Sequence, residues 1–276
     1  MSTTVGAWPE RWQRLGWEHG VWSVVRFGRA LNRFARARWL EELIADQKLE
    51  VGEGQALAVD RELIDLVAAY VPDAERVVDA AMGRMRTESE ANAYCETLKV
   101  EVGVTRTRSA DHHQATKPLV AAVAEVARKV CDRWSLRLVD NPQGRNVWLA
   151  RNHLHVSARR LDGAVSSLVN PFAVWEIKEY WGGGEGKGGG SKMSDAVYEC
   201  HLVGHELRAF EQRSGCKVRH FVFVDGAGQW RTRRSDLLRL LDLEAQGFID
   251  RLFVGSDVET AWEQALERTI AEANAR

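Results

Sequence analysis

The chain has 276 residues, of which 45% are hydrophobic and 28% are charged, and its formal net charge at pH 7 is -1. This composition is ordinary for a soluble globular protein, and the length allows one large domain or two small ones. A net charge near zero excludes a chain-wide polycation, so any DNA binding must come from local basic patches. The chain has no apolar run of about 18 residues and no hydrophobic signal core, so we expect neither a membrane segment nor a secretory signal.

The cysteines indicate the compartment. Cys95, Cys131, Cys200 and Cys216 lie far apart and form no CxxC pair. Reduced thiols in a cytoplasmic protein are the simplest interpretation.

Residues 1–114 are predicted to form a mainly helical region. Apolar residues recur at helical spacing, first in GVWSVVRFGRALNRFARARWLEELIADQ and then in DRELIDLVAAYV and the segment after it. Pro72 is expected to separate two of these helices. Five of the eleven tryptophans fall within the first forty residues and are expected mostly to anchor a core.

A basic stripe marks the first of these helical segments. Arg26, Arg29, Arg33 and Arg36 are spaced by three, four and three residues, which places them on one helix face. Such a stripe is typical either of a helix that contacts phosphates or of a solvated face. Arg29 and Arg33 are therefore candidate DNA contacts.

A polar segment, TRTRSADHHQATK, separates this region from a regular alternation of elements, so we place a domain boundary between residues 114 and 115. The second domain is expected to span residues 115–276. The predicted helices lie at 118–134, 194–214, 235–246 and 257–276, and the predicted strands at 135–139, 146–150, 153–161, 172–180, 217–225 and 251–255.

Asp162 and the Glu176-Ile177-Lys178 triplet are the main candidate site. Side chains alternate across the strand FAVWEIKEY, so Glu176 and Lys178 share one face while Ile177 points to the other. Charges on a strand built for burial are costly unless they have partners. Asp162 closes the preceding strand, and we expect a hairpin to bring it beside Glu176.

These residue types suit phosphodiester hydrolysis. Two carboxylates can hold a hard divalent cation, which activates water and neutralises charge on phosphate. A lysine beside them can position or deprotonate the water, or stabilise the pentavalent phosphorus.

The Asp162 and Glu176-Ile177-Lys178 pattern resembles the PD-(D/E)XK nuclease superfamily, the fold of most type II restriction endonucleases, over about residues 115–256. The element order helix, three strands, helix, strand adds to the resemblance. Leu161 stands where that family often has proline, and no Gln-x-x-x-Tyr follows in the next helix, which argues against the exonuclease branch. The alternative is a surface hairpin that carries an ion pair.

The resemblance implies an α/β (α+β) fold with a restriction-endonuclease-like core, in which helices flank a mixed central sheet. It implies that Asp162, Glu176 and the Ile177 carbonyl bind Mg2+, or Mn2+ as a substitute, and that Lys178 assists the attacking water. The products would carry 5′-phosphate and 3′-hydroxyl ends. The expected partner is double-stranded DNA, bound by a homodimer, with the helical N-terminal region supplying DNA recognition, dimer contacts or both.

Other residues are secondary candidates. Glu125 is a candidate extra acid on the 118–134 helix, although an ion pair with Lys129 is the simpler interpretation. Lys187 and Lys192, in and after a glycine-rich segment, are candidate phosphate contacts. Arg231, Arg233 and Arg234 lie in DGAGQWRTRRSD, predicted as a flexible loop that contacts DNA.

Several alternatives stay open at this point. His201 and His205 have the spacing of a metal pair, but a packed or surface pair is favoured. The whole protein is interpreted first as a sequence-specific restriction endonuclease. The alternatives are a repair or phage-defence nuclease of the same fold, a non-catalytic DNA-binding subunit, and a helical interaction protein.

Overall fold

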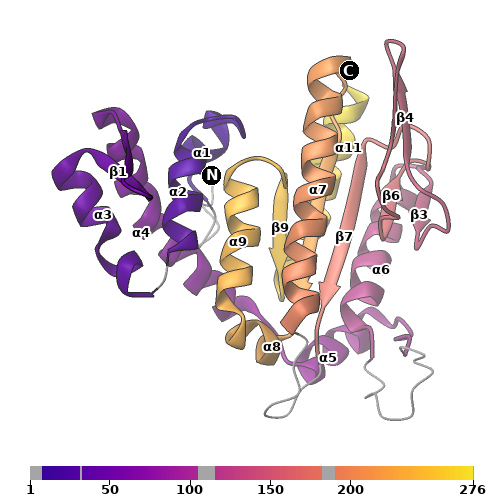
Figure 1. The fold of residues 1–276 in the computed structure, drawn as a ribbon. Coiled ribbons are helices and arrows are strands. Elements are labelled where there is room, and N and C mark those ends of the chain that lie inside the picture. The colour runs from indigo at the N-terminus through magenta and orange to yellow at the C-terminus, as the bar shows by residue number, and fades with distance from the viewer. Residues whose placement is uncertain (1–7, 32, 105–115, 182–189, 276) are drawn as a thin grey trace. The chain divides into compact units, whose positions relative to one another are not determined.

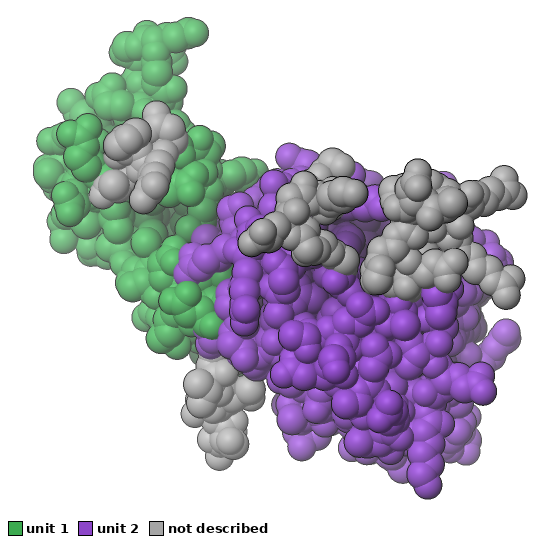
Figure 2. All heavy atoms as spheres, turned by 90° about the horizontal axis from the view of Figure 1, so that it is seen from below, with its two compact units in different colours: residues 1–79 green, residues 80–276 purple. Residues whose placement is uncertain are grey.

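The computed structural model describes residues 8–31, 33–104, 116–181 and 190–275 (Figure 1). By its contacts the chain forms two compact units, residues 1–79 and residues 80–276 (Figure 2). This division lies inside one helix, α4, and 35 residues before the boundary that we predicted at 114/115. The roles expected for residues 1–114 stay predictions.

Unit 1 is mainly helical, as predicted. Its elements are α1 (Glu10–Leu15), α2 (Val21–Ala30), α3 (Arg33–Asp46), β1 (Lys48–Gly52), β2 (Gln55–Ala58) and the first part of α4 (Arg61–Arg84). The antiparallel β1–β2 hairpin was not predicted. The aromatic centre of unit 1 is Tyr70. The centre of its ring lies 5.0 Å from that of Trp12, 5.1 Å from that of Trp8 and 5.4 Å from that of Trp22. These tryptophans therefore anchor a core, as expected.

The predicted break at Pro72 is wrong, because α4 continues through it. Proline removes one backbone hydrogen bond from a helix interior. Tyr70 and Ala74 on either side of it are fully buried, and this packing holds the helix together across the missing bond.

Unit 2 is a mixed α/β fold with helices on both faces of a central sheet. After the end of α4 its helices are α5 (Glu88–Leu98), α6 (Pro118–Arg133), α7 (Gly190–Ser214), α8 (Ala227–Thr232), α9 (Arg234–Ala245), α10 (Asp257–Thr260) and α11 (Trp262–Asn274). Its strands are β3 (Leu138–Asp140), β4 (Val147–Ala150), β5 (His153–Val156), β6 (Gly163–Val165), β7 (Ala173–Glu179), β8 (Arg219–Asp225) and β9 (Arg251–Val254). Among the described helices, none has both the length and the apolar character needed to cross a membrane.

The central sheet has the strand order β3-β6-β7-β8-β9. Strands β3, β6 and β7 form an antiparallel meander, and β7, β8 and β9 run parallel. The mixed sheet was predicted, as was a strand parallel to β7 after the helix that follows it.

The strands around Asp162 differ from the prediction. The strand expected over 153–161 ends at Val156 and pairs only with β4, in a separate two-stranded sheet. The segment after Asp162, expected as a loop, begins with β6. Gly163 makes this pairing possible, because a Cβ there would lie 2.1 Å from the Trp175 ring of β7.

The two faces of the sheet bury different clusters. Trp175 and Phe223 pack against α6 and α11, with Trp262 as a central contact. Val174 packs on the opposite face with α7 residues such as Val203. Figure 1 shows α7 and α9 covering this second face. The alternation predicted for the β7 side chains is therefore confirmed.

Most of the segment 225–236 is helical, with residues 227–232 in α8 and residues from 234 on in α9, so the flexible loop predicted there is wrong. Gly226, with φ of 115°, turns the chain sharply after β8, and α8 and α9 follow. A Cβ on Gly226 would lie 2.1 Å from the Tyr180 carbonyl oxygen. The fully buried Trp230 donates its indole N–H to the Asp225 carbonyl at 3.1 Å, which fixes the turn.

Candidate active site

Strand β7 carries Glu176 and Lys178 into the interior on the α7 face. Only 1% of Glu176 and 6% of Lys178 is exposed. Buried carboxylates and ammonium groups require partners, because desolvation of an isolated charge costs several kcal/mol (~3–5). The site supplies these partners from three neighbouring elements.

Asp162 lies beside Glu176 at the start of β6. Its backbone N–H donates to the Trp175 carbonyl at 3.0 Å, and its Oδ2 accepts from the Ile177 N–H at 2.7 Å. These bonds fix the carboxylate against β7 from the neighbouring strand. Burial and the nearby Glu176 carboxylate raise the pKa of Asp162. Asp162 and Glu176 thus lie near each other, as predicted. Pairing of β6 with β7 brings them together, whereas the prediction had placed Asp162 at the end of a strand over residues 153–161.

A second glutamate and an arginine complete the charge network. Lys178 Nζ donates to Glu176 Oε2 at 2.9 Å and to Glu199 Oε2, from α7, at 2.6 Å. Arg159 Nη1 donates to Glu176 Oε2 at 2.9 Å and also pairs with Glu199. Two cations and two carboxylates therefore alternate around one point.

This network fixes the protonation states of the central pair. Burial opposes ionisation of Glu176, but His220, Lys178 and Arg159 lower the pKa of its carboxyl to about 2. Burial also opposes the charge on Lys178, yet the Glu176 carboxylate raises the lysine pKa above its ordinary value. In this arrangement the Lys178 ammonium group can orient water or stabilise negative charge.

His220 is a neighbour that the sequence analysis missed. It is fully buried on β8, and its Nε2 lies 3.7 Å from Glu176 Oε1. Its Nδ1 contacts the Phe248 carbonyl at 3.1 Å. Glu176 Oε1 and His220 Nε2 are buried atoms without a hydrogen-bond partner among the described residues.

The acidic residues fit part of the expected metal set. Asp162 and Glu176 offer carboxylates from adjacent strands, and the unpaired Glu176 Oε1 is the kind of buried oxygen that a hard cation satisfies. A bound cation would share Glu176 with Arg159. No cluster of three or more His, Cys, Asp or Glu side chains suited to a metal occurs within the described residues. The Ile177 carbonyl stays a predicted ligand.

Glu125 engages neighbours on its own helix. It pairs with Lys129 at 3.6 Å and with Arg128. This is the i,i+4 interpretation that the sequence favoured. His201 and His205 pack against the Phe248 ring, with ring centres 4.8 Å and 6.2 Å from it.

The lysines and arginines that were predicted to contact DNA have different surroundings. Lys187 and the Arg33 side chain lie outside the described residues. Arg29 is 3.9 Å from Glu75, while Arg233 donates to Asp236 at 2.8 Å and to Ser194 at 2.9 Å. The side chains of Lys192 and Arg231 are exposed, and that of Arg234 is partly buried.

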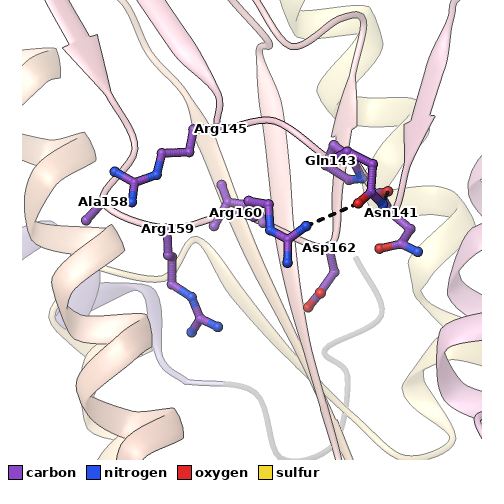
Figure 3. Close-up of a pocket in the computed structure, with 9 residues that line it drawn as sticks. Asn141, Gln143, Arg145, Ala158, Arg159, Arg160 and Asp162 are labelled. Atoms are coloured by element: carbon purple, nitrogen blue, oxygen red, sulfur yellow. Dashed lines mark hydrogen bonds between the residues drawn. The ribbon is translucent and has the colours of Figure 1, made fainter. Parts of the chain in front are cut away.

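A cavity of about 540 Å³ opens beside Asp162 (Figure 3). It lies between the segment before β4 and the segment after β5. Its lining residues are Asn141, Pro142, Gln143, Arg145, Ala158, Arg159, Arg160, Leu161 and Asp162. We call it the arginine cavity. We call Asp162, Glu176 and Glu199, with Lys178 and Arg159, the carboxylate cluster. The cavity adjoins this cluster because Arg159 and Asp162 belong to both.

Fold and site together define a mixed α/β protein with a buried carboxylate–lysine cluster on its central strand. The chain belongs to the family described as a domain of unknown function, DUF7687, whose model matches residues 84–269. No curated protein matches the chain, and no solved structure matches it. The matched range contains the whole central sheet and the candidate site.

Proposed function

We propose that this protein is a Mg2+-dependent, sequence-specific endodeoxyribonuclease of the restriction type, with a restriction-endonuclease-like core in unit 2. The observation that carries the proposal is that Asp162, directly before β6, lies against the part of β7 that carries Glu176 and Lys178. The order α6, β3, β6, β7, α7, β8 agrees with the helix, three strands, helix, strand core of PD-(D/E)XK nucleases, with the β4–β5 hairpin inserted.

Each residue has a role in this proposal. Asp162 and Glu176, with the Ile177 carbonyl, would hold Mg2+, which would supply an activated water and neutralise charge on the phosphate. The Lys178 ammonium group, held between Glu176 and Glu199, would orient the water and stabilise the developing negative charge. Glu199 holds Lys178 from α7 and so positions its ammonium group. The DNA products carry 5′-phosphate and 3′-hydroxyl ends.

A non-catalytic DNA-binding protein of the same fold is the second candidate. The observation that favours it is that Glu176 is almost fully buried and that Lys178 already bonds two carboxylates. Such a network can serve as a scaffold. A repair or phage-defence nuclease would share the chemistry of the first candidate and differ in sequence specificity.

Cleavage of unmethylated phage DNA with Mg2+ separates these candidates. We expect discrete bands from the wild type and a loss of cleavage of at least about 100-fold in both Glu176→Ala and Lys178→Ala. The matched control is Glu96→Ala, which removes an exposed carboxylate from α5. A thermal unfolding curve is recorded for each variant, because removal of one partner from a buried ion pair also destabilises the fold.

Three other outcomes are informative. A smear that both variants abolish keeps the nuclease chemistry and removes sequence specificity. DNA binding without cleavage by the wild type supports the scaffold candidate. Cleavage that survives in folded Glu176→Ala contradicts the proposed site.

A further inference from the structure

The arginine cavity carries cationic groups that the carboxylate cluster does not use. The Arg145 and Arg160 side chains are exposed, and neither forms an ion pair with any residue in the described ranges. Arg160 donates to Gln143 Oε1 at 3.3 Å, a neutral partner (Figure 3). Arg159 differs, because Glu176 and Glu199 neutralise it.

The walls of the cavity are held in place. The Ala158 N–H donates to Glu206 Oε2 of α7 at 3.0 Å, which anchors the segment that carries Arg159 and Arg160. The Asn141 N–H donates to the Asp162 carbonyl at 2.9 Å, which ties the opposite wall to the start of β6. The Arg145 and Arg160 side chains thus extend from anchored segments on either side of the β4–β5 hairpin.

We propose that the arginine cavity binds phosphate groups of a nucleic-acid backbone, with Arg145 and Arg160 as the contacts, and so leads the strand to Asp162. This inference rests on the proposed nuclease function. Arginine presents a planar set of donors that matches phosphate oxygens, and the side-chain amide of Asn141 in the lining adds a donor without charge. Most of the lining is polar, unlike the apolar lining typical of small-molecule pockets.

The position of Asp162 gives the cavity its function. Asp162 lines the cavity and also lies against β7 beside Glu176. A nucleic-acid backbone whose phosphates contact Arg145 and Arg160 would therefore place a neighbouring phosphate next to Asp162 and Glu176. Contacts of this kind set register and affinity without reading sequence. The cavity therefore positions the strand, and base recognition belongs to other surfaces.

Fluorescence anisotropy with a labelled DNA duplex in EDTA tests the inference without cleavage. The variants are Arg145→Gln and Arg160→Gln, and the control is Arg268→Gln, an exposed arginine of α11 whose side chain donates to the Gln264 carbonyl of its own helix. Each cavity variant is expected to weaken binding about five- to tenfold at 0.1 M salt and to lower the slope of log affinity against log salt by about 1. The loss should be equal on two unrelated DNA sequences.

The outcomes separate this inference from the proposed function. If cavity variants bind DNA as tightly as Arg268→Gln does, the cavity assignment is wrong, while metal-dependent cleavage still stands on its own test. If the wild type neither binds nor cleaves DNA, both fail. If calorimetry shows inorganic phosphate bound through Arg145 and Arg160 as tightly as DNA, the cavity is a small-anion site and the backbone assignment is overturned.

Discussion

At the scale of single residues, burial decides which charges matter. Lys178 and Glu176 are common surface residue types, yet both are almost fully buried and bonded to each other at 2.9 Å. A buried pair of this kind gives little net stability over an apolar pair, and removal of one partner costs about 3–5 kcal/mol. The presence of such a pair at the centre of the sheet therefore favours a role in function over a role in stability.

A partly buried carboxyl on α9, that of Glu244, predicts how stability depends on pH. Burial raises the pKa of Glu244 on α9 to about 7, despite the Leu252 N–H that donates to it at 3.0 Å. The folded state therefore binds a proton that the unfolded state, with an ordinary value of 4.5, has already released. The resulting stabilisation is present at pH 5 and is lost as pH rises through 7, which amounts to about 2–3 kcal/mol.

Urea denaturation of Glu244→Gln at pH 5 and pH 8 measures this contribution. The amide keeps an oxygen acceptor for the Leu252 N–H and cannot ionise. In the wild type, Glu244 should lower the unfolding free energy at pH 8 relative to pH 5 by about 2 kcal/mol. The variant should not show this part of the decrease. An unchanged pH dependence would show that another group is responsible.

The sequence predicted the central acids and lysine because their proximity follows from local rules. Alternation along β7 puts Glu176 and Lys178 on one face, and a neighbouring strand brings Asp162 beside them. Arg159 and His220 escaped prediction because their contacts depend on tertiary structure. A histidine in an otherwise apolar strand was the available signal for His220.

At the scale of elements, β6 determines where Asp162 sits. The strand is only three residues long, and it pairs with β7 because Gly163 leaves room for the Trp175 ring. A glycine followed by two small apolar residues was interpreted as loop. The spatial demand of a tryptophan on another strand is invisible to local propensity, so the sequence missed this strand.

Gly163→Ala tests this packing. The added methyl group would lie 2.1 Å from the Trp175 ring, so the ring or the strand must shift. We expect a loss of about 1–3 kcal/mol in unfolding free energy, together with weaker DNA cleavage, because Asp162 moves with β6. Chemical denaturation and the cleavage assay measure the two effects.

Gly83→Ala in α4 is the matched control. A Cβ added at Gly83 would meet no described atom within 4 Å outside its own stretch of helix. There the same change should stabilise the helix by about 0.5–1 kcal/mol. A Gly163→Ala variant as stable and active as wild type would contradict the assigned role of β6.

At the scale of the whole molecule, each of the two units has buried clusters within itself. Unit 1 has its aromatic cluster around Tyr70, and unit 2 contains the complete sheet with a buried cluster on each face. The family match, residues 84–269, falls entirely within unit 2. Unit 2 therefore contains every residue to which we assign a role in the proposed chemistry.

A fragment of residues 80–276 should accordingly fold without unit 1. We expect a single cooperative thermal transition and a near-ultraviolet circular dichroism signal from the buried Trp175, Trp230 and Trp262. The fragment should also keep Mg2+-dependent cleavage, with any change in sequence preference assigned to the missing helical unit. A fragment that lacks a cooperative transition would show that unit 2 depends on residues 1–79 for its stability. A folded fragment without cleavage would instead place an essential part of the activity in the N-terminal unit.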